Sequence, residues 1–111
     1  MALIQLAVSD ETYRRALRDL LVRNGSGPVG CVEKPDLEAP GVLVLDFEHF
    51  SALPLPIAEP ERIVLIADGG PGQMRAAWAA GVKSVVLRKD PVSTAALAVL
   101  SACLHVSVRR G

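Results

Sequence analysis

Charged side chains that could take part in chemistry follow four short aliphatic runs of this sequence. Asp10 follows the first run, Asp46 comes directly after the run GVLVL, Asp68 comes directly after IVLIA, and Arg88 and Lys89 follow the last run. Two carboxylates and a backbone carbonyl are suitable ligands for Mg²⁺, which keeps several waters and binds phosphate oxygens. A cation opposite them can hold the developing charge of a phosphoryl group. These residue types therefore indicate phosphoryl chemistry, provided that the fold brings them together.

Acidic residues at strand ends also have a purely structural use, as helix caps and as solvated loop tips. We assign that use to Asp68, to Glu11 and to the side chain of Glu48, and we expect Asp90, which precedes a proline, to cap a helix. Asp46 is different, because a charge that directly ends the most apolar run is costly without a partner. The sequence thus singles out Asp46 as the principal candidate for function.

The elements that must position these residues alternate between aliphatic runs and segments with helical spacing. The predicted strands are residues 3–8, 28–32, 41–45, 63–67 and 84–87, and the predicted helices are residues 11–23, 72–80 and about 91–103. This alternation is typical of an α/β fold built from βαβ units. We predict a flavodoxin-like, doubly wound sheet of five parallel strands in the order 2-1-3-4-5, with its functional crevice beyond the carboxyl ends of the strands.

Two of the connecting helices are predicted to be reduced. Residues 33–40 are too few for a full helical crossover. Pro54, Pro56 and Pro60 disfavour a regular helix after the third strand. Near the end of the sequence, residues 105–108 alternate between polar and apolar side chains, and this alternation predicts a short additional edge strand.

The composition limits the class of protein. The 111 residues match one domain, since domains usually run to roughly 100–150 residues, and we expect a single domain over residues 1–111. Twelve basic against twelve acidic residues give no net charge, which argues against direct nucleic-acid binding by this chain. No apolar run approaches the roughly 20 residues that cross a membrane, so we expect a soluble, cytoplasmic protein. Cys31 and Cys103 lack metal-site spacing and are expected to be free thiols.

Four segments resemble the receiver domain of two-component response regulators, and the resemblance extends over essentially the full length of the chain. They are Val8-Ser9-Asp10-Glu11 for the family's acidic pair, Val44-Leu45-Asp46 for the phosphoacceptor, Leu65-Ile66-Ala67 for the fourth strand, and Val86-Leu87-Arg88-Lys89-Asp90-Pro91 for the fifth strand and the following helix start. The last segment, which follows Ala80-Gly81-Val82, is the most specific. It looks most like receivers that precede a helix-turn-helix DNA-binding domain, and this implies an output domain beyond residue 111.

The resemblance implies a phosphoacceptor signalling domain with no turnover of its own beyond self-directed phosphoryl transfer. The phosphohistidine of a sensor histidine kinase would donate to Asp46, and Mg²⁺ would be held by Asp10, Asp46 and the main-chain carbonyl of Glu48. Lys89 would pair with the phosphoryl group, or Arg88 if the alignment shifts by one residue. Phosphorylation would then reposition the surface formed by the family's fourth helix, fifth strand and fifth helix, through which the chain would bind partners or form a homodimer.

Several residues depart from the family's pattern. Ile66 stands at the switch position, where a Thr or Ser hydroxyl normally bonds the phosphate, and Ser9 leaves the metal one carboxylate short. His49 and Phe50 replace the usual Met-Pro.

The sequence therefore leaves two functions open. The first is a phosphorylation-dependent receiver, and the second is an atypical receiver, or pseudo-receiver, that acts as a phosphorylation-independent interaction or dimerisation module. An enzyme on the same fold is disfavoured, because residues 69–72 (GGPG) match neither nucleotide-binding fingerprint.

The role of five further side chains is less specific. Trp78 lies in a helix with no clear polar face, so the sequence allows either a core position or an exposed position at an interface. His49 and His105 stand apart from other ligand types, and we assign neither of them to metal binding or acid–base work. Arg109 and Arg110 are expected to be a solvated end or the start of a linker.

Overall fold

Five parallel strands form a single sheet in the order β2-β1-β3-β4-β5. The computed structural model describes residues 3–25 and 27–110, and for residues 105 and 107–110 it describes the backbone alone. The strands are β1 Leu3–Ala7, β2 Val29–Cys31, β3 Gly41–Asp46, β4 Ile63–Ala67 and β5 Ser84–Leu87. The predicted flavodoxin-like sheet and its strand order are therefore confirmed.

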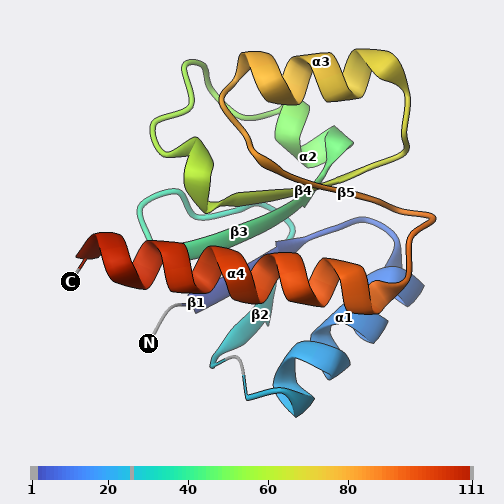
Figure 1. Cartoon of the computed structure of the whole chain (residues 1–111), viewed down its shortest axis with the longest axis vertical. Coiled ribbons are helices and arrows are strands. Elements are labelled where there is room, and N and C mark those ends of the chain that lie inside the picture. The colour runs from blue at the N-terminus through green and yellow to red at the C-terminus, as the bar shows by residue number, and fades with distance from the viewer. Residues whose placement is uncertain (1–2, 26, 111) are drawn as a thin grey trace.

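Helices cover both faces of the sheet (Figure 1). Helices α1 (Glu11–Arg23) and α4 (Val92–Arg110) lie on one face, and α2 (Phe47–Ser51) and α3 (Pro71–Ala79) lie on the other. A 3₁₀ turn, η1 (Pro60–Arg62), leads into β4. Each face has its own apolar cluster, one under α1 and α4 and one under α2 and α3. Because β3 and β4 contribute to both clusters, their continuous aliphatic runs are buried on both sides, as expected for central parallel strands.

Gly41, at the start of β3, is required by the close approach of β1. It has a φ of +115°, which L side chains rarely adopt, and an added Cβ would overlap the carbonyl oxygen of Leu3. Leu3 and Gly41 are paired in the β1–β3 register. This glycine therefore allows β1 and β3 to lie side by side, and these are the two strands whose carboxyl ends hold Ser9 and Asp46.

The predicted reduction of two helices is confirmed. Residues 32–40, which connect β2 to β3, contain no helix, and the helix after β3 is only five residues long. After α2 the chain crosses residues 52–59 without regular structure before it reaches η1. Prolines in this segment fix φ and remove amide donors, so a longer helix cannot form there.

The prediction of an additional edge strand at residues 105–108 is wrong. Helix α4 does not end near residue 103 but continues to Arg110. Ala95, Val99 and Ala102 are buried on its inner face, and Val106 packs against the same cluster. This spacing of four, three and four residues continues the helical period, and it outweighs the local alternation of side chains. The side chains of His105, Arg109 and Arg110 lie outside the described residues, so the expectations for them stay predictions.

In the described part of the chain, none of the helices has both the length and the apolar character needed to cross a membrane.

Candidate functional site

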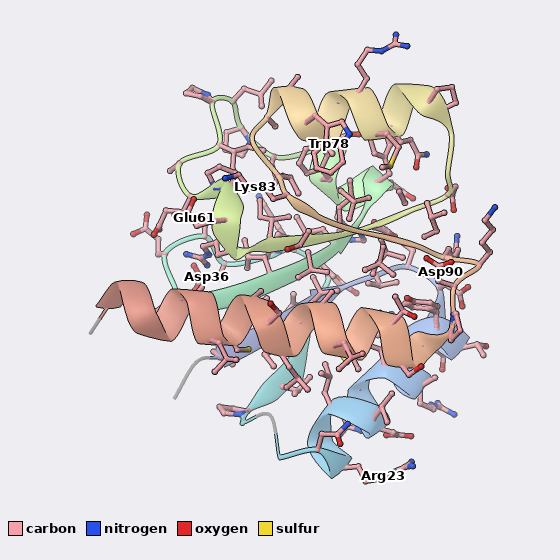
Figure 2. All side chains as sticks on the ribbon, viewed as in Figure 1. Arg23, Asp36, Glu61, Trp78, Lys83 and Asp90 are labelled. Carbon is pink, nitrogen blue, oxygen red and sulfur yellow. The ribbon has the colours of Figure 1, made fainter. Side chains whose placement is uncertain are left out.

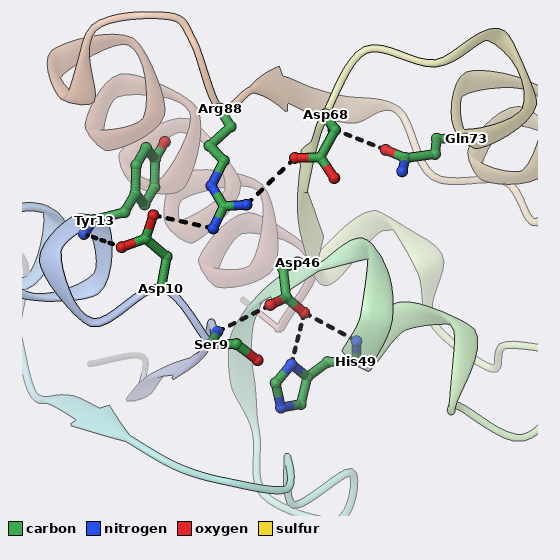
Figure 3. Close-up of polar contacts among 8 residues, drawn as sticks. All are labelled: Ser9, Asp10, Tyr13, Asp46, His49, Asp68, Gln73 and Arg88. Carbon is green, nitrogen blue, oxygen red and sulfur yellow. Dashed lines mark hydrogen bonds and ion pairs between the residues drawn. The ribbon is translucent and has the colours of Figure 1, made fainter.

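Asp46 lies at the carboxyl end of β3, and its carboxylate is held by three N–H groups (Figure 3). One oxygen accepts from the backbone amide of Ser9 at 2.9 Å. The other accepts from the backbone amide of His49 at 2.9 Å and contacts the Nδ1 atom of the His49 ring at 2.6 Å. The Asp46 side chain is only 15% exposed. Both oxygens of the candidate phosphoacceptor thus already have close hydrogen-bond partners within the protein.

These contacts decide the ionisation of Asp46. Burial of the carboxyl group acts to raise its pKa, but the amides of Ser9 and His49 and the His49 ring together outweigh burial, so the pKa of Asp46 lies below its ordinary value. The carboxylate also caps α2, because the amide that it binds is at the third position of that helix. Asp46 is therefore an anion with a structural role in the first turn of α2.

His49 is the residue of this site that the sequence did not assign. Its Nδ1 atom faces Asp46, and its Nε2 atom lies 3.0 Å from the main-chain carbonyl of Glu33 in the β2–β3 connection. Both neighbours are acceptors, so both contacts are hydrogen bonds only when each ring nitrogen carries a proton. In that form His49 joins β3, α2 and the β2–β3 connection at one point. A histidine three residues after a helix-capping aspartate was the signal that could have identified this contact from the sequence.

Arg88 connects the other two acids of this edge (Figure 3). Its guanidinium lies 3.0 Å from Asp10, which follows β1, and 3.4 Å from Asp68, which follows β4. Asp10 has a second contact, because its other oxygen accepts from the amide of Tyr13 at 3.1 Å and so caps α1. The structure thus brings Asp10, Asp68 and Arg88 together in one ion-pair network, next to Asp46 at the same edge but with separate partners.

Lys89 and Ile66 occupy the positions that the sequence indicated. Lys89 is exposed and lines an open groove with Asp10, Asp68 and Arg88, but among the described residues it is Arg88 that makes the ion pairs with the two acids. Ile66 is paired with Asp46 in the β3–β4 register and is 3% exposed. A buried isoleucine has no group that could bond a phosphoryl oxygen beside Asp46.

The ligand set expected for Mg²⁺, which is Asp10, Asp46 and the main-chain carbonyl of Glu48, stays a prediction. Among the residues that the structure describes, no three His, Cys, Asp or Glu side chains are grouped in a way that could hold a metal ion. Asp10 and Asp46 are each engaged with protein N–H donors, as described above. Glu48 lies at the second position of α2, the helix that Asp46 caps.

Glu11 and Glu48 have the structural surroundings expected for them, but Asp90 bonds the turn before α4 and, among the described residues, caps none of the amides of that helix. Glu11 forms an exposed ion pair with Arg15 in the first turn of α1, and the Glu48 side chain is exposed. Asp90 accepts from the amide of Leu87 at 3.3 Å, so the bond that it makes closes the turn between β5 and α4.

The structure also shows the surroundings of Trp78, Cys31 and Cys103. Trp78 lies on α3 with 52% of its surface exposed, so it is not a core residue (Figure 2). Both cysteines are free thiols, as the sequence predicted. Cys31 is exposed, and Cys103 is half-buried, which raises the pKa of its thiol.

Comparisons with known proteins show a similarity in structure but none in sequence. No protein-family model matches the chain, and no curated protein matches it in sequence. The structure is similar to a signal receiver domain of two-component signal transduction (histidine kinase) from Clostridium thermocellum, with a TM-score of 0.68 and 16% sequence identity, over 92% of this chain and 97% of that chain. At this identity the likeness concerns the fold. The chain therefore has the fold of a signal receiver domain, which is the fold that its sequence predicted.

Proposed function

We propose that this chain is a receiver-type signalling domain that acts through protein–protein contacts, and that Asp46 anchors its structure rather than accepting a phosphoryl group. The observation that carries the proposal is the carboxylate of Asp46, which is held by the Ser9 amide, the His49 amide and the His49 ring. These bonds hold the carboxylate in its capping position, and each charge-assisted bond contributes about 1.5–3 kcal/mol.

The surroundings of Asp46 support the same proposal. Phosphoryl transfer depends almost entirely on positioning and on cations that stabilise the transferred charge. Arg88 is engaged with Asp10 and Asp68, and the residue beside Asp46 on β4 is the buried Ile66. A phosphoryl group on Asp46 would therefore meet no free guanidinium from Arg88 and no hydroxyl from its β4 neighbour in this arrangement.

Phosphoryl transfer to Asp46 is the second candidate, and one observation favours it. Asp46 is anionic, because its pKa is lowered, and it lies at the carboxyl edge of the sheet where functional groups collect in such folds. In this reaction a carboxylate oxygen attacks phosphorus and forms an acyl phosphate, while the P–N bond of a kinase phosphohistidine breaks and its electron pair stays on the imidazole nitrogen. Lys89 or Arg88 would face the product, and Mg²⁺ would be the expected metal.

One experiment separates the two candidates. Purified wild type and Asp46→Asn are incubated with acetyl phosphate and Mg²⁺, with an active receiver domain as a positive control, and their intact masses are measured while circular dichroism confirms that both are folded. We expect neither protein to gain a phosphoryl group. A phosphoryl gain by wild type that Asp46→Asn lacks would overturn our proposal and establish Asp46 as a phosphoacceptor.

The partners of the domain follow from its place in signalling. We propose a cytoplasmic location, with a second copy of the chain or a signalling protein, such as a sensor histidine kinase, as the partner. The surface proposed for this contact consists of α3, β5 and α4, which correspond to the family's fourth helix, fifth strand and fifth helix. Nucleic-acid contact, in this proposal, belongs to an output domain outside residues 1–111.

A further inference from the structure

A small apolar cavity lies on the α2 side of the molecule, toward the amino ends of the strands and away from Asp46. Its volume is about 110 Å³, and its apolar walls include Leu37, Leu43, Leu53, Ile57 and Ile63. The cavity lies beneath residues 52–59, the irregular segment between α2 and η1 that Figure 1 shows passing outside the sheet. This segment replaces most of a covering helix, and the short α2 leaves space against the sheet that a longer helix would fill.

A buried arginine forms part of the cavity wall. The Arg62 side chain is only 9% exposed. Its Nη2 atom donates to the carbonyl of Ala39 at 2.6 Å, and its Nη1 atom lies 3.6 Å from the carboxylate of Glu59, whose side chain is 61% exposed. The Nε atom of Arg62 is buried and has no hydrogen-bond partner among the described residues.

Among the described residues, this guanidinium has one anionic partner, the mostly exposed Glu59 carboxylate at 3.6 Å. A buried charge is normally paired and fully hydrogen-bonded, because removing it from water is costly. Glu59 is distant for a hydrogen bond and is mostly in water, so it compensates the charge of Arg62 only in part. A carboxylate that entered the cavity would provide the missing acceptor, and an arginine fork suits a carboxylate in particular.

The size and the walls of the cavity define the rest of the ligand. An apolar cavity of about 150 Å³ accommodates benzene, which has six non-hydrogen atoms, so this smaller cavity suits a ligand with at most about six. Walls of leucine, isoleucine and proline favour a branched aliphatic body, and a guanidinium that Glu59 compensates only in part favours a ligand with no more than one negative charge. We propose that this cavity binds a small branched aliphatic monocarboxylate, with its carboxylate on Arg62 and its apolar body between Leu53, Ile57 and Ile63. This proposal goes beyond the function proposed for Asp46 and does not depend on it.

The test compares isobutyrate with isobutyramide, a neutral ligand of nearly the same shape. Each is titrated into ¹³C-methyl-labelled wild type at pH 7 and constant ionic strength, and the methyl shifts of Leu53, Ile57 and Ile63 are followed by NMR. We expect saturable shifts at millimolar isobutyrate and roughly 10-fold or greater weakening for the amide, since a hydrogen bond to a charged group contributes about 1.5–3 kcal/mol. Equal affinities for the two ligands, or no saturable shift in the folded wild type, would overturn the proposal.

Two variants assign the binding to Arg62 and to the cavity. Arg62→Met should lose the preference for the acid over the amide, whereas Arg75→Met, which removes an exposed arginine of α3, should retain it. If Arg62→Met does not fold, Ile57→Trp tests whether the ligands bind in this cavity, because a large side chain that fills the cavity should abolish binding of both ligands. Isobutyrate binding that persists unchanged in Ile57→Trp, or in folded Arg62→Met, would place the ligand elsewhere and refute the proposed site.

Discussion

Asp46 carries a negative charge in a side chain that is 15% exposed, and the donors around it make that charge favourable. Because the pKa of Asp46 is lower in the folded chain than in the unfolded one, ionisation of this group stabilises the fold. The stability that Asp46 contributes therefore depends on pH. The stabilisation is present above the unfolded pKa of about 3.9, and it is lost as the pH falls through the lower folded value.

Replacement of Asp46 tests this contribution. Asp46→Ala should lower the free energy of unfolding at pH 7 by about 1–2 kcal/mol, because α2 loses its cap and the Ser9 amide loses its acceptor. Asp46→Asn should cost less at pH 7, since asparagine still caps, and its difference from wild type should narrow as the pH is lowered from 6 to 3. Urea unfolding followed by circular dichroism measures both effects.

A neighbouring acid provides the control for this measurement. Glu48→Gln makes the same charge change on an exposed side chain of α2, and it should alter stability by less than about 0.5 kcal/mol. If Asp46→Ala were as stable as wild type at pH 7, the three bonds to Asp46 would contribute nothing measurable, and its structural role would be refuted.

At the residue scale the sequence predicted where the charges lie but not all of their partners. The positions of Asp10 and Asp46 follow from the strand ends, which aliphatic runs define well. The choice between Arg88 and Lys89 was left open, because successive residues after a strand point in different directions and the turn geometry decides between them. In the structure it is Arg88 that bridges Asp10 and Asp68. The ring of His49 was missed because its function depends on Asp46 and Glu33, and the Glu33 contact is tertiary.

At the scale of the elements, the contact between β1 and β3 depends on one glycine. Gly41→Ala should destabilise the fold by more than about 2 kcal/mol, because the new Cβ would overlap the Leu3 carbonyl oxygen and the φ of +115° is strained for alanine. The matched control is Gly30→Ala on the edge strand β2, where an added Cβ meets nothing within 4 Å. Thermal unfolding of the two variants measures the difference, and equal losses of stability would contradict the proposed close approach.

The elements themselves were predicted best where the pattern was continuous. The sequence gives β4 and β5 the bounds that the structure shows, since a short aliphatic run between turn signals has few alternatives. It predicted a reduced helix after β3, and the Asp46 cap and the 47–51 segment form one short helix before the prolines. The end of α4 was missed because local alternation suggested a strand, whereas the packing of Val106 on the core favours the helix.

At the scale of the whole molecule, the sheet separates two apolar clusters, and the outer surfaces of the helices remain for partners. Leu97 and Leu104 on α4 are each 69% exposed, and their spacing of seven residues puts them on one face of the helix. Trp78 on α3 is a further exposed apolar side chain. Each leucine that becomes fully buried against a partner contributes about 1.5–3 kcal/mol, so this pair on two copies favours association, which the loss of translational and rotational freedom opposes.

We therefore predict concentration-dependent self-association through the exposed pair on α4. Sedimentation of the wild type should show a monomer–dimer equilibrium, and Leu97→Glu with Leu104→Glu should be monomeric at all concentrations, because four like charges would face one another in the dimer. Since both leucines are exposed, the urea midpoint of this double variant should stay close to that of the wild type. Leu55→Glu, which changes a 79% exposed leucine of the 52–59 segment, is the matched control and should still associate. A wild type that remains monomeric at the highest soluble concentration would exclude a second copy as the partner of this surface and leave a different protein in that role.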